Sequence, residues 1–242
     1  MTDEVLEQSE AVSAADRKIL VLGHSHTNAL SMALAETPDP SFQVINVNTL
    51  DEQSDLTRQG LLRLSKPTHL VSMVGGNTYY QVALLEHPQR LQVLSGPEDT
   101  DLDPERHLVT YQMMRDFLAN ACRGHFQLIA RMQEVYELPL THVISPPPLA
   151  AADLSDILPP AYRKNGSAGT VPPLLRLKIY QMKSEIIREF CASRSFGVIG
   201  PPAEACDEQG FLRDAYRSFT ATHAGKEYGH LVMKQIAEMV NG

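Results

Sequence analysis

The sequence has few cysteines and is short of positive charge. Its 242 residues contain three scattered cysteines (Cys122, Cys191 and Cys206), and none of them forms a CxxC pair. This pattern excludes a disulfide framework and fits a reducing compartment. Acidic residues outnumber basic ones by 29 to 21, which gives a formal net charge of −8. Such a charge argues against nucleic acids and anionic membranes as partners.

Long hydrophobic runs are also missing. No apolar run reaches the roughly 20 residues that cross a bilayer, and residues 1–17 lack the charged-then-apolar layout of a secretory signal. We therefore expect a cytoplasmic protein without membrane insertion, in which residues 1–17 form an acidic tail. The sequence has no internal repeat and no long low-complexity linker, so residues 18–242 should form a single domain.

Short apolar runs alternate with helical patterns along this domain. Buried parallel strands read as continuous apolar runs, and their alternation with helices implies βαβ crossovers. We therefore predict an α/β fold, a three-layer α/β/α sandwich of flavodoxin-like architecture with a five-stranded, mainly parallel sheet. The expected strands are residues 19–22, 41–47, 68–74, 141–145 and 196–199, and the expected helices are residues 28–35, 52–64, 105–136, 174–193 and 226–240.

Two segments interrupt this pattern. Residues 86–104 contain several prolines and acidic residues, and residues 153–173 are rich in proline and glycine. Long loops of this kind in a compact domain are often lids or binding loops. We expect two irregular insertions that shape the mouth of a pocket, where Arg163 and Lys164 would meet an anionic substrate.

The first apolar run ends at a glycine and is followed by a serine that lies between two histidines. Gly23 follows the run, and Ser25 then lies between His24 and His26 at the start of a helical pattern. Ligands in open α/β sheets gather at such strand-to-helix corners. Ser25 is therefore a candidate nucleophile, although a serine before a helix also commonly caps the helix.

Two further polar residues follow or precede elements at the expected sheet edge. Asn77 comes after Gly76 at the end of the third strand, and His223 precedes the last helix. A neutral histidine can act as the base for a serine nucleophile, and an asparagine N–H can stabilise an oxyanion. The structural alternatives are that Asn77 is only a turn residue and that His223 caps a helix or lies exposed.

In this order, the three segments resemble the sequence blocks of the SGNH (GDSL-type) hydrolases and acyltransferases. Residues 23–25, Gly-His-Ser, are similar to the Gly-Asp-Ser block, and residues 75–77, Gly-Gly-Asn, are similar to the Gly-x-Asn block. Residues 220–230 resemble the last block, which contains Asp-x-x-His. The resemblance spans about residues 18–240, which is nearly the whole domain.

The resemblance implies a role for each candidate residue. Ser25 would be the nucleophile, His223 the general base, and Asn77 an oxyanion donor together with the Ser25 backbone N–H. The implied reaction is ester hydrolysis or O-acyl transfer through an acyl-serine, without a metal or an organic cofactor. The substrate would be a small-molecule or carbohydrate-borne ester.

The chain departs from this pattern at three positions. His24 replaces the aspartate of the first block, and Thr220 stands where the triad aspartate would be. The oxyanion glycine expected after the second strand is missing, and either Asn48 or a local backbone N–H would have to substitute for it. These departures support a second hypothesis, a binding or regulatory module with weakened catalysis, because loss of the carboxylate behind a catalytic histidine costs about 10⁴ in turnover.

A third hypothesis is a metal enzyme, because four histidines lie near the candidate blocks. Imidazoles suit zinc, iron or copper, and the four are His24, His26, His223 and His230. No HExxH motif and no cysteine cluster accompanies them. We therefore assign no metal and expect His24 and His26 to line the pocket and donate hydrogen bonds to a polar substrate.

Overall fold

The computed structural model describes residues 18–53, 55–64, 66–75, 79–94, 103–159, 162 and 169–241. The acidic tail expected at residues 1–17 lies outside these residues, and so do Arg163 and Lys164.

The core of the protein is a five-stranded sheet in which every neighbouring pair of strands is parallel. This confirms the expected α/β fold. The spatial order is β2-β1-β3-β6-β7, so the first strand lies between the second and the third. Their bounds are β1 (Ile19–Gly23), β2 (Phe42–Asn46), β3 (His69–Met73), β6 (Leu140–Val143) and β7 (Gly197–Ile199).

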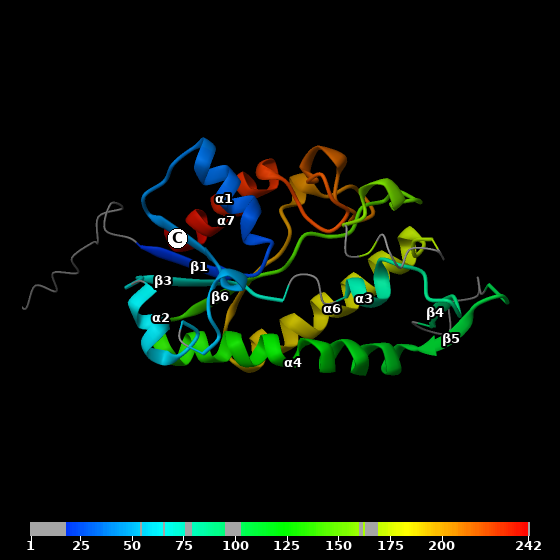
Figure 1. Cartoon of the computed structure of the whole chain (residues 1–242), viewed down its shortest axis with the longest axis horizontal. Coiled ribbons are helices and arrows are strands. Elements are labelled where there is room, and N and C mark those ends of the chain that lie inside the picture. The colour runs from blue at the N-terminus through cyan, green and yellow to red at the C-terminus, as the bar shows by residue number, and fades with distance from the viewer. Residues whose placement is uncertain are drawn as a thin grey trace, which may run out of the picture.

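Helices cover both faces of the sheet, which gives the predicted three layers (Figure 1). On one face lie α1 (Thr27–Glu36) and α7 (Lys226–Asn241), and on the other lie α2 (Arg58–Leu64), α4 (Tyr111–Tyr136) and α6 (Pro173–Ser193). Among the described residues, none of the helices combines the length and the apolar character needed to span a membrane.

The continuous apolar run of β1 is explained by burial on both faces. Ile19 and Val21 belong to the core cluster that contains residues of α1 and α7, and Leu20 and Leu22 belong to the cluster that contains residues of α2 and α4. Because successive side chains of a strand point to opposite faces, a strand between two helical layers needs an apolar residue at every position.

Two expected helices begin later than predicted, and each begins at a threonine cap. The helix expected from residue 105 starts at Tyr111, where the Thr110 hydroxyl accepts a hydrogen bond from the Met113 N–H. The helix expected from residue 52 starts at Arg58, and the Thr57 hydroxyl accepts from the Gly60 N–H. A capping side chain satisfies an N–H that the helix leaves unpaired, and it fixes the start of the helix there.

The first insertion is not wholly irregular, which corrects the expectation for residues 86–104. It contains β4 (Leu91–Leu94), which pairs in parallel with β5 (His107–Thr110) as a separate two-stranded sheet. A short helix, α3 (Tyr80–Ala83), precedes this insertion.

A close contact between the first and the last helix brings distant parts of the chain together. A Cβ atom on Gly229 of α7 would lie 2.1 Å from the backbone oxygen of Ala29 in α1. Only glycine therefore lets the two helices approach this closely. The contact places the segment before α7 beside the corner between β1 and α1.

Candidate active site

Ser25 lies in the turn between β1 and α1. The strand ends at Gly23, where a Cβ atom would lie 2.5 Å from the Cβ of Met73, so β1 and β3 pack tightly at this point. The helix begins at Thr27 with His26 in the capping position. The interpretation of Ser25 as a helix cap is therefore wrong, and its hydroxyl has another partner.

That partner is His223. The Ser25 Oγ lies 2.8 Å from the His223 Nε2, although the two residues are 198 positions apart in the sequence. The His223 backbone is fixed by a hydrogen bond from the Ser218 N–H to its carbonyl, at 2.9 Å. In the same loop the Gly225 N–H donates to the Tyr216 carbonyl at 2.8 Å. The structure thus brings the predicted nucleophile and the predicted base into hydrogen-bonding contact.

The other nitrogen of the imidazole contacts two hydroxyl groups. The His223 Nδ1 lies 3.1 Å from the Thr220 Oγ1 and 2.9 Å from the Thr222 Oγ1. The side chain of Thr220 therefore occupies the orienting position that an aspartate would take. Thr222 is buried and was not singled out from the sequence, where the available signal was a second threonine directly before the histidine.

The two hydroxyl partners affect the pKa of His223 differently from a carboxylate partner. Burial lowers the pKa of His223, and the two threonines bring no negative charge that would raise it again. A hydroxyl can also accept or donate a hydrogen bond, so it does not fix the tautomer as a carboxylate does. When Nδ1 carries the proton and donates it to a threonine oxygen, Nε2 is free to accept the proton of Ser25.

His24 points toward the end of β3. Its Nδ1 accepts a hydrogen bond from the Gly75 N–H at 2.8 Å, and its ring packs edge-on against His125 with the centroids 5.1 Å apart. Burial lowers the pKa of His24, and burial with the neighbouring charges lowers the pKa of His125 to about 4. A neutral imidazole at His24 keeps Nδ1 available as the acceptor that ties β1 to the residue after β3.

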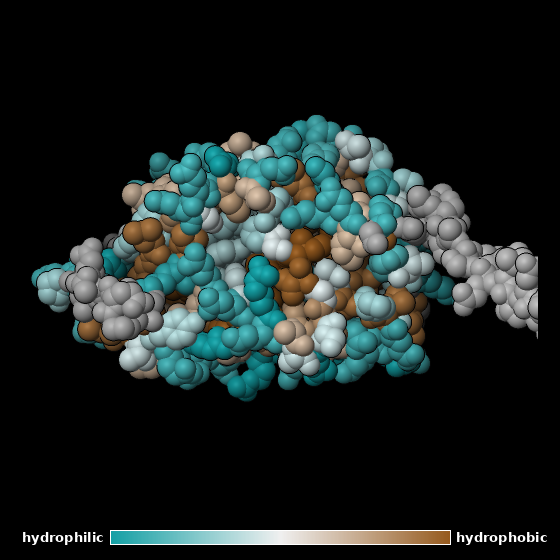
Figure 2. Space-filling view, turned by 180° about the vertical axis from the view of Figure 1, so that it is seen from behind, coloured by the Kyte–Doolittle hydropathy of each residue, from teal (hydrophilic) through white to brown (hydrophobic). Residues whose placement is uncertain are grey.

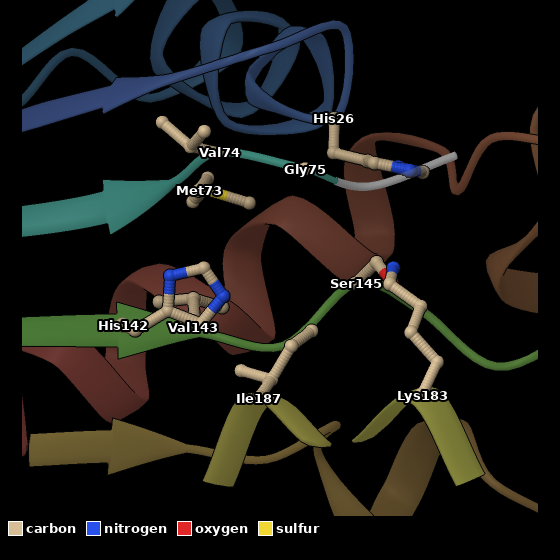
Figure 3. A pocket seen from close by; sticks show the side chains of 9 residues that line it. All are labelled: His26, Met73, Val74, Gly75, His142, Val143, Ser145, Lys183 and Ile187. Atoms are coloured by element: carbon tan, nitrogen blue, oxygen red, sulfur yellow. The ribbon is translucent and has the colours of Figure 1, made fainter. Parts of the chain in front are cut away.

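The ring of His26 lies beside the ring of His223, which with Ser25 forms what we call the dyad. His26 is buried, and its ring centroid lies 5.3 Å from that of His223. It also lines a narrow pocket whose opposite wall carries Ser145 and Lys183 (Figure 3). His24 thus contacts Gly75 at the end of β3, whereas His26 lines a pocket beside the dyad.

The pocket of Figure 3 also contains polar residues that were not predicted from the sequence. The Lys183 Nζ donates to the Ser145 Oγ at 3.2 Å, and complete burial lowers the pKa of Lys183 to about 8. His142 contacts the Ser72 Oγ at 3.3 Å, and burial lowers the pKa of His142 to about 3. A lysine in a helix or a histidine in a strand gives no sequence signal of burial, so these residues become visible only in the fold.

Three of the predicted site residues receive less support. Gly76 and Asn77 lie outside the described residues. Asn48 is exposed in a short turn after β2, and its N–H donates to the Asn46 Oδ1 at 3.0 Å. The end of β2 is next to the end of β1, since Asn46 pairs in register with Gly23. The roles of these three residues stay predictions.

The histidines do not assemble a metal site in the part of the chain that the structure describes. Within that part, no group of three histidine, cysteine, aspartate or glutamate side chains could hold a metal ion. His230 instead lies in the first half of α7, with its Nε2 3.2 Å from the Glu36 Oε2.

Solved structures share this architecture, although no sequence relative was found. No family model and no curated protein matches the chain. A proposed acylhydrolase from Bacteroides fragilis aligns over 94% of this chain and 89% of its own, with a TM-score of 0.50 and 12% identity. A proposed platelet activating factor from Streptococcus pneumonia aligns over 95% of this chain and 86% of its own, with a TM-score of 0.50 and 14% identity.

A GDSL-like lipase from Bacteroides thetaiotaomicron aligns over 92% of this chain and 89% of its own, with a TM-score of 0.46 and 15% identity. At such identities a likeness reports the fold and leaves the reaction open. The chain has an SGNH-type hydrolase fold.

Proposed function

We propose that this protein is a serine hydrolase that cleaves ester bonds through an acyl-serine intermediate. The observation that carries the proposal is the 2.8 Å contact between the Ser25 Oγ and the His223 Nε2 at the carboxyl end of the sheet. A serine becomes a useful nucleophile when a neighbouring base can take its proton. The SGNH-type fold and the description of the B. fragilis neighbour as an acylhydrolase support the same reaction class.

The proposed reaction has two stages. In the first, the His223 Nε2 takes the proton of Ser25 while the Oγ attacks the ester carbonyl, and the Ser25 N–H and Asn77 donate to the oxyanion. The imidazolium then gives its proton to the leaving alcohol, which leaves an acyl group on Ser25. In the second stage, His223 deprotonates a water molecule that releases the acyl group as an acid.

The acceptor in the second stage decides between two forms of the activity. Water gives an esterase, and an alcohol bound in its place gives an O-acyltransferase. The substrate class that we propose is a small-molecule or carbohydrate-borne ester, handled without a metal or an organic cofactor. His24 and His26 would contribute through the shape of the site, His24 by tying the end of β1 to Gly75.

The pH dependence of turnover should report the pKa of His223. The base works only as the neutral imidazole, so activity is present above the pKa of His223 and is lost as the pH falls through it. Burial lowers this pKa from its ordinary value of 6.5. We therefore expect the acid limb of kcat/KM to lie below pH 6.5, as measured with an ester whose leaving group does not titrate in that range. An acid limb above pH 7 would contradict the inference that His223 is buried beside uncharged partners.

Substitution of the proposed base, His223, distinguishes the enzyme hypothesis from the binding-module hypothesis. Among the described residues, the His223 Nδ1 contacts two threonine hydroxyls and no carboxylate, and this observation favours a catalytically weakened module. If the protein is an enzyme, His223→Ala should lower turnover of short acyl esters by about 10²–10⁴, since a general base contributes that much. The matched control is His230→Ala, whose imidazole contacts the surface acid Glu36; this exchange should leave turnover unchanged.

The ester panel is measured at high protein concentration, so that slow turnover is detected. If the wild-type protein hydrolyses none of these esters, or if His223→Ala and His230→Ala retain equal activity, the binding module becomes the better account.

A further inference from the structure

The two insertions, far apart in the sequence, meet in space. The Glu86 N–H donates to the Gly169 carbonyl at 3.0 Å, and the Val171 N–H donates to the Leu84 carbonyl at 3.1 Å. Together with the β4–β5 sheet they form what we call the insertion lobe, residues 84–94, 103–110 and 169–171, at the right of Figure 1. The lobe lies against α3 and the first turns of α4 and α6.

A cavity of about 310 Å³ lies between the insertion lobe and these helices. Nine of the eleven described residues that line it are apolar. The buried Val93, Met114 and Ile179 form its deep wall, and the exposed His87 and Pro88 lie on the solvent side. Hydrophobic surface is visible at this end of the molecule, on the left of Figure 2. The cavity therefore runs from a polar edge at the surface into an aliphatic interior.

The charge near this cavity is already balanced within the protein. The Glu86 carboxylate lines the cavity and accepts two hydrogen bonds from the Arg106 guanidinium, both at 3.0 Å. Both side chains of this ion pair are nearly buried. A polar ligand entering the cavity would lose its hydration without gaining a charged partner, which is costly.

The size and lining of the cavity favour a flexible apolar ligand. Protein interiors are close-packed and contain few voids larger than a water molecule, so a space of this size needs an explanation. An engineered apolar cavity of about 150 Å³ binds benzene, and this cavity is about twice as large. Among the described lining residues the one aromatic ring is the imidazole of His87 on the solvent side, so the aliphatic interior offers no ring to stack on a planar ligand.

We propose that this cavity is a binding site for an unbranched aliphatic chain, whose polar end stays at the His87 side. The chain could belong to the acyl group of an ester substrate or to a separate lipid-like ligand. Helix α3 connects the two regions, because Val82 lines the cavity while the Tyr80 hydroxyl lies 3.5 Å from the carbonyl of Ala221 in the loop that carries His223. Binding at this site is measured without turnover, so its test does not depend on the proposed hydrolysis.

The test is a calorimetric titration of the full-length chain with hexanoate, octanoate and decanoate below their micellar concentrations. Affinity should rise about fourfold for each added methylene, as expected for transfer of a CH₂ group into an apolar site. Leu175→Trp places a bulky side chain in the lining and should weaken decanoate binding at least tenfold. Its matched control is Leu174→Trp, the neighbouring residue on α6, which is 69% exposed and does not line the cavity.

Since the sequence contains no tryptophan, each of these two variants carries a single tryptophan whose fluorescence reports whether the protein is folded. If Leu175→Trp fails to fold, Leu91→Phe, at a partly buried lining position, takes its place. Loss of decanoate binding in the cavity-filling variant, with retention in Leu174→Trp, supports the site. No decanoate binding to the wild-type chain, or equal binding to both folded variants, would overturn it.

Hydrolysis of an ester series from acetyl to decanoyl then identifies the source of the chain. If filling the cavity lowers kcat/KM for decanoyl esters but not for acetyl esters, the site holds the acyl group of the substrate. If filling the cavity abolishes decanoate binding and leaves the ester preference unchanged, the site holds a separate ligand. Either result supports the aliphatic site.

Discussion

Ser25→Ala is expected to abolish ester turnover and to leave the stability of the fold nearly unchanged. In the proposed mechanism this hydroxyl forms the acyl intermediate, and the loss of such a nucleophile costs on the order of 10³–10⁶ in kcat. Among the described residues, the same hydroxyl makes one hydrogen bond in a partly exposed position, to the His223 Nε2. A single hydrogen bond contributes about 1 kcal/mol to stability, so thermal unfolding should shift by only a few degrees.

A fluorophosphonate probe measures the reactivity of the same atom directly. The wild-type protein should be labelled, and mass spectrometry of its peptides should place the label on Ser25. Ser31→Ala is the matched control, because Ser31 is exposed on α1, only six residues away, and the exchange should leave labelling intact. Equal labelling of the wild-type and Ser25→Ala proteins would refute the assignment of the nucleophile.

Thr220→Asp is expected to raise kcat by about 10–10³. The threonine oxygen lies 3.1 Å from the His223 Nδ1, so a carboxylate at this position can accept the Nδ1 proton. A carboxylate fixes the productive tautomer and stabilises the imidazolium that forms during the reaction, and losing these effects costs about 10⁴ in a triad enzyme. The gain should be smaller than that factor, because the Thr222 Oγ1, 2.9 Å from the His223 Nδ1, can already accept the Nδ1 proton.

The pH profile distinguishes this electrostatic effect from a change in packing. A negative charge beside the imidazole raises the pKa of His223, so the acid limb of kcat/KM should move to higher pH in Thr220→Asp. Thr220→Asn is the control, since it offers a similar shape without the charge and should show neither the higher kcat nor the moved limb. If both variants behave alike, the orienting role of position 220 is wrong.

The sequence was sufficient for the elements whose signals are local. The run at residues 19–22 predicts a strand buried on both faces, and the observed β1 is fully buried. The alternation of runs and helices predicts a parallel sheet, which the pairing of β1, β3 and β6 confirms. Ser25 was located by the glycine that ends the first strand and His223 by the helix that follows it, and both signals lie within a few residues of the site.

The remaining features depend on contacts that a single sequence does not display. The partner of His24 is the N–H of Gly75, 51 residues away, and nothing in the Gly-His-Ser segment indicates it. The strand at residues 107–110 was assigned to a helix, because its apolar residues also fit a helical face and its pairing with β4 is a tertiary contact. Lys183 falls within the helix predicted over residues 174–193, and nothing in the sequence marks its burial, which depends on tertiary contacts with Ser145 and Tyr79.

The close packing of α1 against α7 has a consequence during protein synthesis. The ribosome makes Ser25 198 residues before His223, and at about 5–20 residues per second this interval lasts about 10–40 s. Throughout that time the serine has no base, because the contact at Gly229 that brings the two together has not yet formed. In the nascent chain the Ser25 hydroxyl therefore lacks its proposed base until the final helix docks.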